Sequence, residues 1–331
     1  MANKAKIKVG IVGLGKMGIM HACLLNTFSN VSITALCDKS RIIRAIARQP
    51  FPEAVITENL AKFQGLNLDA VFVLTPIPIH YHIIKQIYEQ KISKNIFVEK
   101  TLTSSYEQSD ELATISKRNG GITMVGYMKR FGVTFKHAEI LLSQQILGDL
   151  TSFHAYAFSS DFVSVKKDST AIISRGGVLE DLGSHVVDLS VWLFGNLRVT
   201  SATINSQIHP NSEGDISFTT DGIDGMTGKF DVSWRKYDYR MPEFGITING
   251  TKGRLSVNDD EVRLELKDAP TKRWYRADMN DNVGFLLSSP EYWREDKHFL
   301  DSLIAGKETE CSFKDSLKVD FLLESVRRMS K

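Results

Sequence analysis

"IKVGIVGLGKMG", residues 7–18, is the stretch that decides the fold. Its first six residues form an apolar run of the length of one strand, and residues 16–28 then have helical spacing. Between them lie Gly13, Gly15 and Gly18 in the pattern G-x-G-x-x-G. Gly13 permits a tight turn, Gly15 lets the backbone approach a pyrophosphate, and Gly18 lets the helix pack on the strand. The stretch therefore predicts the start of a βαβ unit that binds a dinucleotide.

Asp38 extends this prediction, because it follows Gly18 by twenty residues at the end of the expected second strand. An acid there can hold the two ribose hydroxyls of NAD and would repel the 2′-phosphate of NADP. Lys39 and Arg41 lie beside it and could accept that phosphate, so NAD is favoured and NADP is the alternative. A glycine-rich turn with a solvated aspartate is the competing interpretation. The predicted cofactor contacts here are Gly13, Gly15, Lys16, Met17, Gly18, Asp38 and Lys39.

The first 126 residues alternate apolar strands with helices. We expect strands at 7–12, 31–37, 54–57, 70–74, 96–98 and 122–125, and helices at 16–28, 40–48, 79–90 and 104–118. Strands that are apolar throughout and separated by helices indicate a parallel sheet covered on both faces. In such a sheet ligands bind beyond the carboxyl ends of the strands.

Two of those carboxyl ends carry polar residues. Thr75, Pro76 and His80 follow the strand at 70–74, where two prolines force a turn at the mouth of the crevice. His80 either faces the cofactor or caps the next helix, and the second interpretation is favoured. Glu99 and Lys100 end the next strand. We therefore expect them to face the crevice, and this interpretation is favoured over a surface ion pair between them. Thr75, Pro76, His80, Glu99 and Lys100 therefore join the predicted cofactor contacts.

After Gly126 the pattern changes to strands with period-two alternation. The expected elements are a helix at 135–146, strands at 151–158, 226–234, 244–248 and 262–266, and final helices at 292–304 and 316–329. One face of the strands is apolar, and the other carries charged residues such as Lys229 and Arg263. This predicts a mostly antiparallel open sheet with helices on one face. We therefore expect a dinucleotide-binding Rossmann domain at 1–126 and an α+β domain for substrate binding and oligomerisation at 127–331.

The segment "RGGVLEDLGSHVVD", residues 175–188, places Asp181 and His185 four positions apart on one helix face. A carboxylate one turn from an imidazole can orient it and raise its basicity. A helix-start aspartate beside a satisfied buried histidine is the alternative. A divalent metal pair is a further alternative, but no third ligand is apparent, so no metal is predicted.

Composition narrows the function classes. The 331 residues carry a net charge of +2, which gives no general attraction to nucleic acid or to an anionic membrane. The three cysteines have neither metal-site nor redox spacing. No run of eighteen apolar residues and no signal-type N-terminus is present, so we expect a cytoplasmic protein.

Six stretches together resemble the Gfo/Idh/MocA oxidoreductases, a family that includes inositol dehydrogenases, glucose–fructose oxidoreductase and many sugar dehydrogenases. These stretches are "GLGKMG" (13–18), "LTPIPIH" (74–80), "VEKTL" (98–102), "GYMKRF" (126–131), "GGVLEDLGSHVVDL" (176–189) and "INGTKGRLSV" (248–257). The order and spacing of these stretches are specific to the family, and the resemblance runs from the first strand to the last helix.

The resemblance implies that Lys100, Asp181 and His185 are a catalytic trio. His185 would move the hydroxyl proton, Lys100 would stabilise charge on the reacting oxygen, and Asp181 would orient His185. The reaction implied is hydride transfer between NAD(P) and a hydroxyl or ketone carbon of a sugar, cyclitol or sugar derivative. Because adjacent strand residues point to opposite sides, we expect Glu99 to be mainly structural. The resemblance also implies a homodimer or homotetramer.

Two departures from the family pattern affect the site. Thr101 stands where the family has a proline after the lysine, and Arg175 stands where it has a third glycine. Arg175 either brings a cation to the substrate mouth, which would suit a phosphate, carboxylate or nucleotide-linked sugar, or it faces solvent. The predicted substrate contacts are therefore Lys100, Arg175, Asp181 and His185. A non-catalytic dinucleotide-binding regulator and an NAD-dependent glycosidase are the alternative functions.

Overall fold

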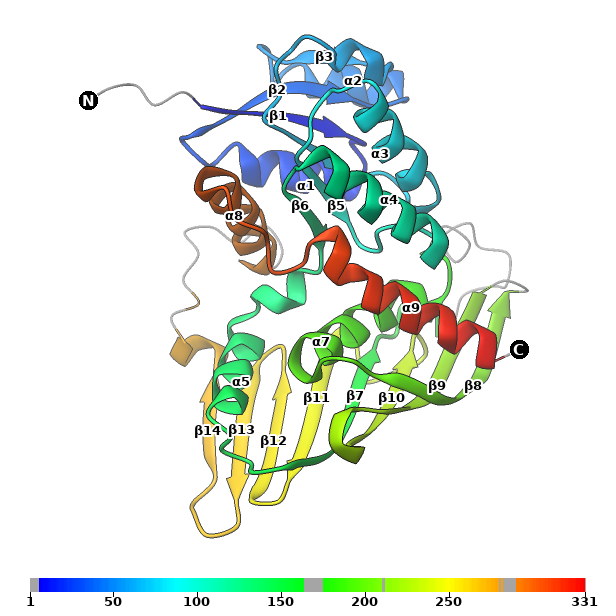
Figure 1. The fold of residues 1–331 in the computed structure, drawn as a ribbon, viewed down its shortest axis with the longest axis vertical. Coiled ribbons are helices and arrows are strands. Elements are labelled where there is room, and N and C mark those ends of the chain that lie inside the picture. Colours follow the sequence, from blue (N-terminus) through cyan, green and yellow to red (C-terminus); the bar gives the residue numbers. More distant parts are fainter. Residues whose placement is uncertain (1–5, 164–174, 210–211, 280, 282–289, 331) are drawn as a thin grey trace. The chain divides into compact units, whose positions relative to one another are not determined.

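The computed structural model describes residues 6–163, 175–209, 212–279, 281 and 290–330. Their contacts divide the chain into two compact units (Figure 1). The first unit combines Met1–Tyr127 with Phe285–Leu317, and the second combines Met128–Gly284 with Lys318–Lys331. Each unit is built around one sheet.

The first unit contains a six-stranded sheet in the order β3-β2-β1-β4-β5-β6, and every neighbouring pair is parallel. Its strands are β1 (Ile7–Val12), β2 (Val31–Cys37), β3 (Val55–Thr57), β4 (Ala70–Val73), β5 (Ile96–Glu99) and β6 (Thr123–Gly126). Its helices include α1 (Lys16–Leu25), α2 (Arg41–Ala47), α3 (His80–Glu89) and α4 (Tyr106–Asn119), with short turns η1 (Leu60–Phe63) and η2 (Ile77–Ile79). The predicted doubly wound parallel sheet is confirmed. The strand order reverses between β1 and β4, and ligands bind at such a point.

The core of the first unit is aromatic and includes a helix from late in the chain. Phe72 of β4 and Phe97 of β5 are fully buried and stack with ring centroids 4.7 Å apart. Phe299 of α8 (Pro290–Ala305) meets both rings edge-on, at 5.4 and 5.8 Å. Beyond α8, the backbone N–H of Val125 donates to the carbonyl of Cys311 at 2.9 Å. Residues from two distant parts of the sequence therefore build one core.

The second unit contains an eight-stranded sheet in the order β14-β13-β12-β11-β7-β10-β9-β8. Its strands are β7 (Leu150–Phe158), β8 (Arg198–His209), β9 (Ser212–Asp221), β10 (Thr227–Ser233), β11 (Glu243–Gly250), β12 (Gly253–Asn258), β13 (Glu261–Leu266) and β14 (Lys272–Tyr275). The β7–β10 pair is parallel and the others are antiparallel, so the predicted mostly antiparallel sheet is confirmed. Helices α5 (Val133–Ser143) and α7 (Ser184–Phe194) pack on one face of it (Figure 1).

The remaining elements of the second unit are short, apart from the last helix. They are η3 (Met128–Phe131), the π-helical turn η4 (Leu179–Gly183), η5 (Ile223–Gly225) and η6 (Arg276–Met279). The last helix is α9 (Phe313–Met329), and the division between the units falls within it.

The two faces of the second sheet differ in chemistry, as the alternation in the sequence predicts. Phe230 and Val232 point into the core and are almost fully buried. On the other face Asp231 accepts from Lys229 at 2.9 Å and lies 2.7 Å from the Nε2 of His154. Period-two side-chain direction therefore separates the core face from a polar face.

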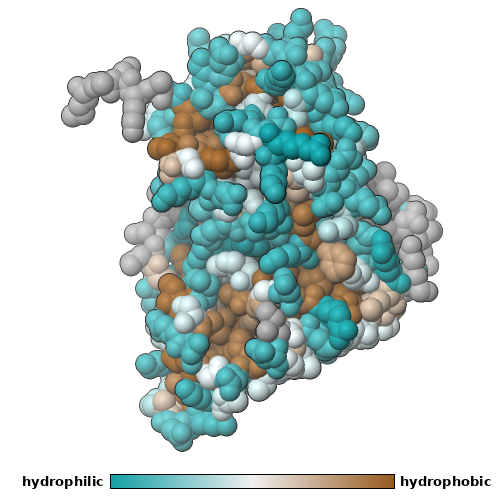
Figure 2. All heavy atoms as spheres, in the orientation of Figure 1, coloured by the Kyte–Doolittle hydropathy of each residue, from teal (hydrophilic) through white to brown (hydrophobic). Residues whose placement is uncertain are grey.

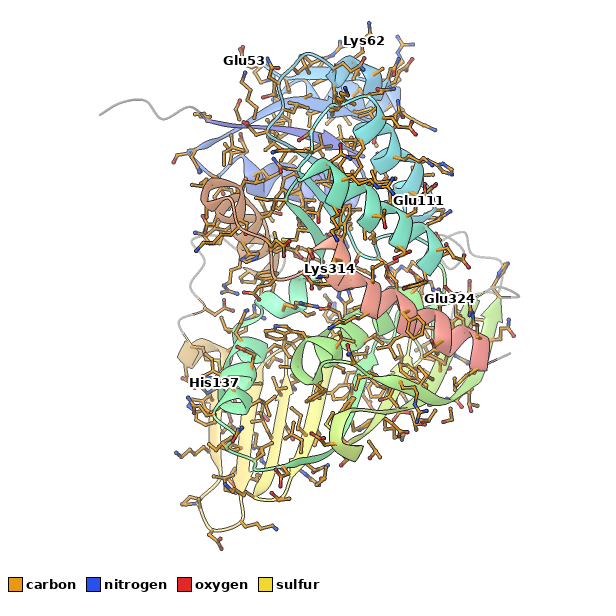
Figure 3. All side chains as sticks on the ribbon, in the orientation of Figure 1. Glu53, Lys62, Glu111, His137, Lys314 and Glu324 are labelled. Atoms are coloured by element: carbon orange, nitrogen blue, oxygen red, sulfur yellow. The ribbon has the colours of Figure 1, made fainter. Side chains whose placement is uncertain are left out.

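The surface of the first unit is mostly hydrophilic on the side that Figure 2 shows. Glu53, Lys62 and Glu111 are exposed on it (Figure 3), and Glu111 pairs with Lys85 at 2.9 Å. None of the helices in the described ranges combines the length and the apolar character needed to cross a membrane.

Candidate active site

The glycine loop after β1 has the geometry that its spacing predicts. Gly13 has a φ of +92°, and a Cβ there would lie 2.7 Å from the carbonyl oxygen of Leu74. A Cβ on Gly18 would lie 2.0 Å from the carbonyl oxygen of Gly13. At Gly15, by contrast, a Cβ would meet nothing within 4 Å. The loop therefore leaves open space beside Gly15, at the N-terminus of α1, where backbone N–H groups favour a phosphate.

Asp38 lies at the end of β2 and contacts this loop. One carboxylate oxygen accepts from the backbone N–H of Leu14 and the other from that of Ser40, both at 2.7 Å. A carboxylate has about four acceptor positions, so two remain for ribose hydroxyls. Lys39 and Arg41, the residues that could bind a 2′-phosphate, are exposed beside it. Lys16 and Met17 begin α1 in the same loop.

Arg44 stabilises this corner, and the sequence reasoning did not identify it. Its guanidinium donates to the carbonyls of Asp38 and Lys39 at 2.7 and 2.8 Å, and it pairs with Glu58 at 2.8 Å. The signal available in the sequence is Ser40, whose hydroxyl caps α2 and places Arg44 one turn later. Arg44 therefore holds the loop that carries Asp38.

The turn after β4 is tied to the end of β5 by His80. The His80 imidazole is fully buried, with Nδ1 3.0 Å from the carbonyl of Thr101 and Nε2 2.7 Å from that of Thr75. Burial lowers the pKa of His80, and the two carbonyls oppose this shift. Pro76 precedes η2 in this turn. The buried hydroxyl of Thr75 has no hydrogen-bond partner among the described residues, so it can serve a bound group.

Glu99 and Lys100 lie at the carboxyl end of β5, as predicted. The Glu99 carboxylate is buried, and one oxygen accepts from the backbone N–H of Lys100 at 3.1 Å. Its other oxygen lies 3.1 Å from Nε2 of His21. Thr101, in the place of the family's proline, is fully buried, and its hydroxyl donates to the carbonyl of Thr103 at 3.0 Å. The peptide bond between Lys100 and Thr101 is cis.

Asp181 and His185 do not share one regular α-helix, which corrects the helix expected from their spacing. Asp181 lies in the π-helical turn η4, and His185 lies in the first turn of α7. A carboxylate oxygen of Glu213 accepts from the N–H of Leu179 at 2.8 Å and holds the start of the turn. Single π-helical turns are rare and occur frequently at functional sites.

Arg175 contacts the predicted catalytic carboxylate. Its guanidinium lies 3.2 Å from Asp181 and 2.6 Å from Asp161, and its side chain is 40% exposed. The indole N–H of Trp234 donates to the same Asp181 oxygen at 3.1 Å. Arg175 is therefore both partly exposed and ion-paired with Asp161 and Asp181.

His185 is buried and its ring meets that of Phe244 edge-on at 5.1 Å. The ammonium of Lys129 lies 4.7 Å from the Phe244 ring centre and pairs with Asp259 at 2.5 Å. Lys129 belongs to "GYMKRF", a stretch that the sequence reasoning matched to the family without giving this residue a role. In the second unit the Phe244 ring therefore contacts both the imidazole of His185 and the ammonium of Lys129.

A buried ion pair fixes the helix that carries His185. Arg130 donates to both carboxylate oxygens of Asp188, at distances between 2.6 and 3.1 Å, and both side chains are almost fully buried. Such two-point pairing is geometrically specific. It joins η3 to α7 three residues beyond His185.

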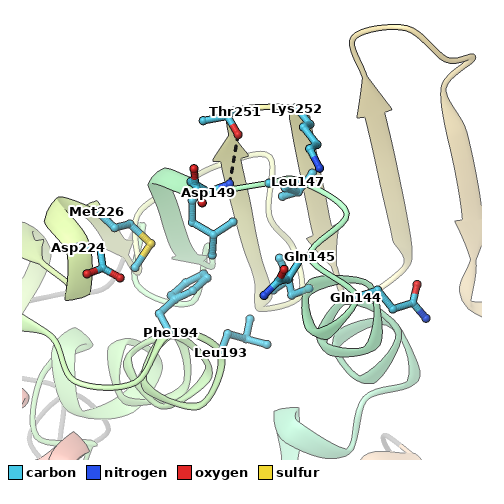
Figure 4. A pocket seen from close by; sticks show the side chains of 13 residues that line it. Gln144, Gln145, Leu147, Asp149, Leu193, Phe194, Asp224, Met226, Thr251 and Lys252 are labelled. Carbon is cyan, nitrogen blue, oxygen red and sulfur yellow. Dashed lines mark hydrogen bonds between the residues drawn. The ribbon is translucent and has the colours of Figure 1, made fainter.

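Two further kinds of site were considered in the described residues, a metal site and a cavity away from the predicted site residues. No group of three or more histidine, cysteine or acidic residues within the described ranges could hold a metal ion. A cavity of about 930 Å³ lies in the second unit near Gln145, Asp149 and Lys252 (Figure 4). In it the N–H of Asp149 donates to the hydroxyl of Thr251 at 3.1 Å. None of the predicted site residues lines this cavity.

Known proteins share the Rossmann fold and the second domain of this chain. Residues 7–127 match the oxidoreductase family described as having an NAD-binding Rossmann fold, and residues 135–256 match the GFO/IDH/MocA C-terminal domain. The oxidoreductase YrbE of Bacillus subtilis is 23% identical over 339 residues, covering 98% of this chain and 94% of the relative. Myo-inositol 2-dehydrogenase of Thermotoga maritima is 23% identical over 343 residues, covering 98% and 96%.

Among solved structures, levoglucosan dehydrogenase in complex with NADH and L-sorbose superposes with a TM-score of 0.87 at 18% identity. That match covers 98% of this chain and 97% of the other, so the whole fold is shared. The family matches together span well over half of the 331 residues. The chain is therefore a member of the Gfo/Idh/MocA family and an NAD(P)-dependent oxidoreductase.

Proposed function

We propose that this chain transfers a hydride between NAD and a hydroxyl or ketone carbon of a sugar, cyclitol or sugar derivative. The relatives named for their substrates support this class, since one acts on myo-inositol and a structural neighbour is a levoglucosan dehydrogenase. The observation that carries the proposal is the placement of three ionisable side chains, those of Lys100, Asp181 and His185. Lys100 ends β5 at the carboxyl edge of the Rossmann sheet, and Asp181 and His185 lie on and directly after a π-helical turn.

The residues present fit the dinucleotide. Gly13, Gly15 and Gly18 would hold the pyrophosphate against α1, with Lys16 and Met17 in the same loop, and Asp38 would hold the adenosine ribose beside Lys39. Thr75, Pro76 and His80 form the turn after β4, and the free hydroxyl of Thr75 suits a bound polar group. When bound, the nicotinamide supplies or accepts the hydride. Residues 1–126 would bind the cofactor and residues 127–331 the substrate.

The chain's own groups would handle the proton and the charge. We propose that His185 accepts the hydroxyl proton during oxidation and returns it during reduction. Lys100 would donate a hydrogen bond to the reacting oxygen and stabilise its negative charge. Asp181 would orient His185, and Arg175 and Trp234 support this role because both bind the Asp181 carboxylate.

Arg175 bears on the substrate class. Its positive charge is balanced by Asp161 and Asp181, so it is poorly suited to bind a further anion. We therefore propose a neutral sugar or cyclitol in preference to a phosphorylated, carboxylated or nucleotide-linked one. Besides Arg175, the residues that would contact this substrate are Lys100, Asp181 and His185.

A screen tests the function directly. Neutral sugars, cyclitols, sugar phosphates and sugar nucleotides are incubated with the protein and NAD or NADP, and NADH or NADPH absorbance is recorded. We expect turnover with at least one neutral polyol. Cofactor binding without turnover would favour a regulator, and sugar release without net NADH would favour a glycosidase.

Cofactor choice is the first prediction. We expect tighter binding of NAD(H) than of NADP(H), because Asp38 has acceptor capacity for the ribose hydroxyls and its charge repels a phosphate. Titration calorimetry with both cofactors measures this, and Lys62→Ala, an exposed residue of the same unit, is the control. Tenfold tighter NADP binding, about 1.4 kcal/mol, would overturn the prediction and make Lys39 and Arg41 phosphate ligands.

Assembly is the second prediction. The polar face of the second sheet is the one opposite the helices α5 and α7, and we propose that it pairs copies into a homodimer or homotetramer. Light scattering at micromolar concentration should give two or four times the mass of one chain, and a monomer would refute this.

A cytoplasmic location is also proposed, because free thiols at Cys23, Cys37 and Cys311 suit a reducing compartment.

A further inference from the structure

A buried charged cluster lies beneath the carboxyl end of β5. His21, on α1, is fully buried, with Nδ1 2.8 Å from an oxygen of Asp296 and Nε2 3.1 Å from an oxygen of Glu99. Asp296 comes from α8 and is also fully buried, and Glu99 is nearly so. All three residues belong to the first unit. None of the sequence motifs suggests a role for His21 or Asp296.

The contacts of His21 and the charges beside it favour an imidazolium, while burial raises the pKa of Asp296 and opposes its ionisation. Ionised carboxylates only accept hydrogen bonds, and a neutral imidazole has a single N–H. Both contacts of His21 are therefore hydrogen bonds to ionised carboxylates only when the ring is an imidazolium. Burial opposes this charge, but Asp296 and Glu99 outweigh it and raise the pKa of His21 well above its ordinary value. A buried charge is retained only when paired in this way.

The cluster is connected to Lys100 through Glu99. Phe97 and Glu99 are two residues apart on β5 and point to the same side, where the His21 ring packs 5.3 Å from that of Phe97. The second Glu99 oxygen accepts from the backbone N–H of Lys100 at 3.1 Å. A chain of hydrogen bonds thus runs from Asp296 through His21 and Glu99 to the backbone of Lys100.

We propose that His21 is a positioning residue that fixes Glu99 and thereby sets the direction of the Lys100 side chain for catalysis. This inference rests on the proposed function for the role of Lys100. A carboxylate without a buried cation beside it would turn toward water or take up a proton, and the Lys100 backbone would lose its acceptor. Misplacing a catalytic group by about 1 Å can lower a rate about 100-fold.

His21→Gln tests the proposal, because glutamine is neutral and cannot provide two N–H groups in opposite directions. We expect kcat to fall about 10- to 100-fold, with the Kd for NADH within about threefold of the wild-type value. Phe299→Leu is the matched control, since it loosens the same core from α8 and leaves the charged cluster intact. A His21→Gln loss no larger than that of Phe299→Leu would overturn the proposal.

A double variant separates positioning from general stability. In a Lys100→Ala background, His21→Gln should lower kcat less than about twofold further, because its effect passes through Lys100. A full 10- to 100-fold loss in that background would overturn the inference. Wild-type turnover by Lys100→Ala alone would instead refute the catalytic role proposed for Lys100, on which this inference rests.

Two spectroscopic measurements need no substrate. The ¹⁵N spectrum of His21 should show both ring nitrogens protonated at pH 7, and a neutral ring would overturn the proposal. After reductive ¹³C-methylation, the Lys100 signal, assigned by its loss in Lys100→Arg, should shift in His21→Gln and not in Phe299→Leu. An unchanged Lys100 signal in His21→Gln would also overturn the proposal, whatever the outcome for the proposed function.

Discussion

Replacing His185 with alanine should lower turnover on an identified substrate by roughly 10²–10⁴-fold, the range for removing a general acid–base group. The imidazole is buried against Phe244, and its replacement by alanine removes the group proposed to move the proton. The loss should shrink at high pH, where hydroxide can take the proton. Steady-state kinetics from pH 6 to about pH 10, followed by NADH absorbance, measure both effects.

His82→Ala is the control for this variant, because His82 is an exposed histidine on α3. It should keep the turnover and the pH profile of the wild-type protein. A loss at His185→Ala that stays constant across the pH range would assign this histidine to binding or stability. The proton transfer would then belong to another group.

Lys100→Ala should lower turnover by roughly two to three orders of magnitude and leave the Kd for NAD nearly unchanged. An oxygen that gains negative charge needs a donor beside it, and Lys100 stands at the carboxyl end of β5, where ligands of a parallel sheet bind. Single-turnover kinetics and calorimetry separate the two quantities. Lys94→Ala, which removes an exposed charge before the same strand, is the control.

The losses at Lys100 and His185 should not add fully, because in the proposed mechanism both groups act on one oxygen. Kinetics of the variant that carries both Lys100→Ala and His185→Ala therefore test whether the two side chains act together, which neither single variant can show. Wild-type turnover by Lys100→Ala would mean that the family's mechanism does not carry over to this chain.

The Rossmann sheet could be predicted closely because its strands are apolar on both faces. The predicted strands at 7–12 and 31–37 coincide with β1 and β2. Helix α1 ends at Leu25 and not at residue 28, because Thr27 turns back to the carbonyl of Leu24 through its N–H and hydroxyl. The sequence marks strands such as β8 and β9 less clearly. Few side chains of β8 are buried, so hydrophobic alternation does not mark it.

The sequence supplies candidate site residues, whereas most of their contacts could not be predicted from it. Local spacing identifies Asp38, Lys100, Asp181 and His185, because each follows a strand or stands one turn from a partner. The partners of Arg175 and His21 come from far along the chain, and no local pattern indicates them. The π-helical turn at Asp181 depends on packing around it, including Glu213, which lies on β9.

The assembly of the first unit from two separate sequence segments has a consequence for synthesis on the ribosome. Residues up to Tyr127 emerge first, but the unit is complete only when Leu317 has been made, about 190 residues later. At about 5–20 residues per second this delay is roughly 10–40 s. Throughout it, Phe72 and Phe97 lack their cover from Phe299, and His21 lacks Asp296. The nascent nucleotide-binding half therefore exposes part of its apolar core until translation is almost finished, and chaperones bind exposed apolar surface of this kind.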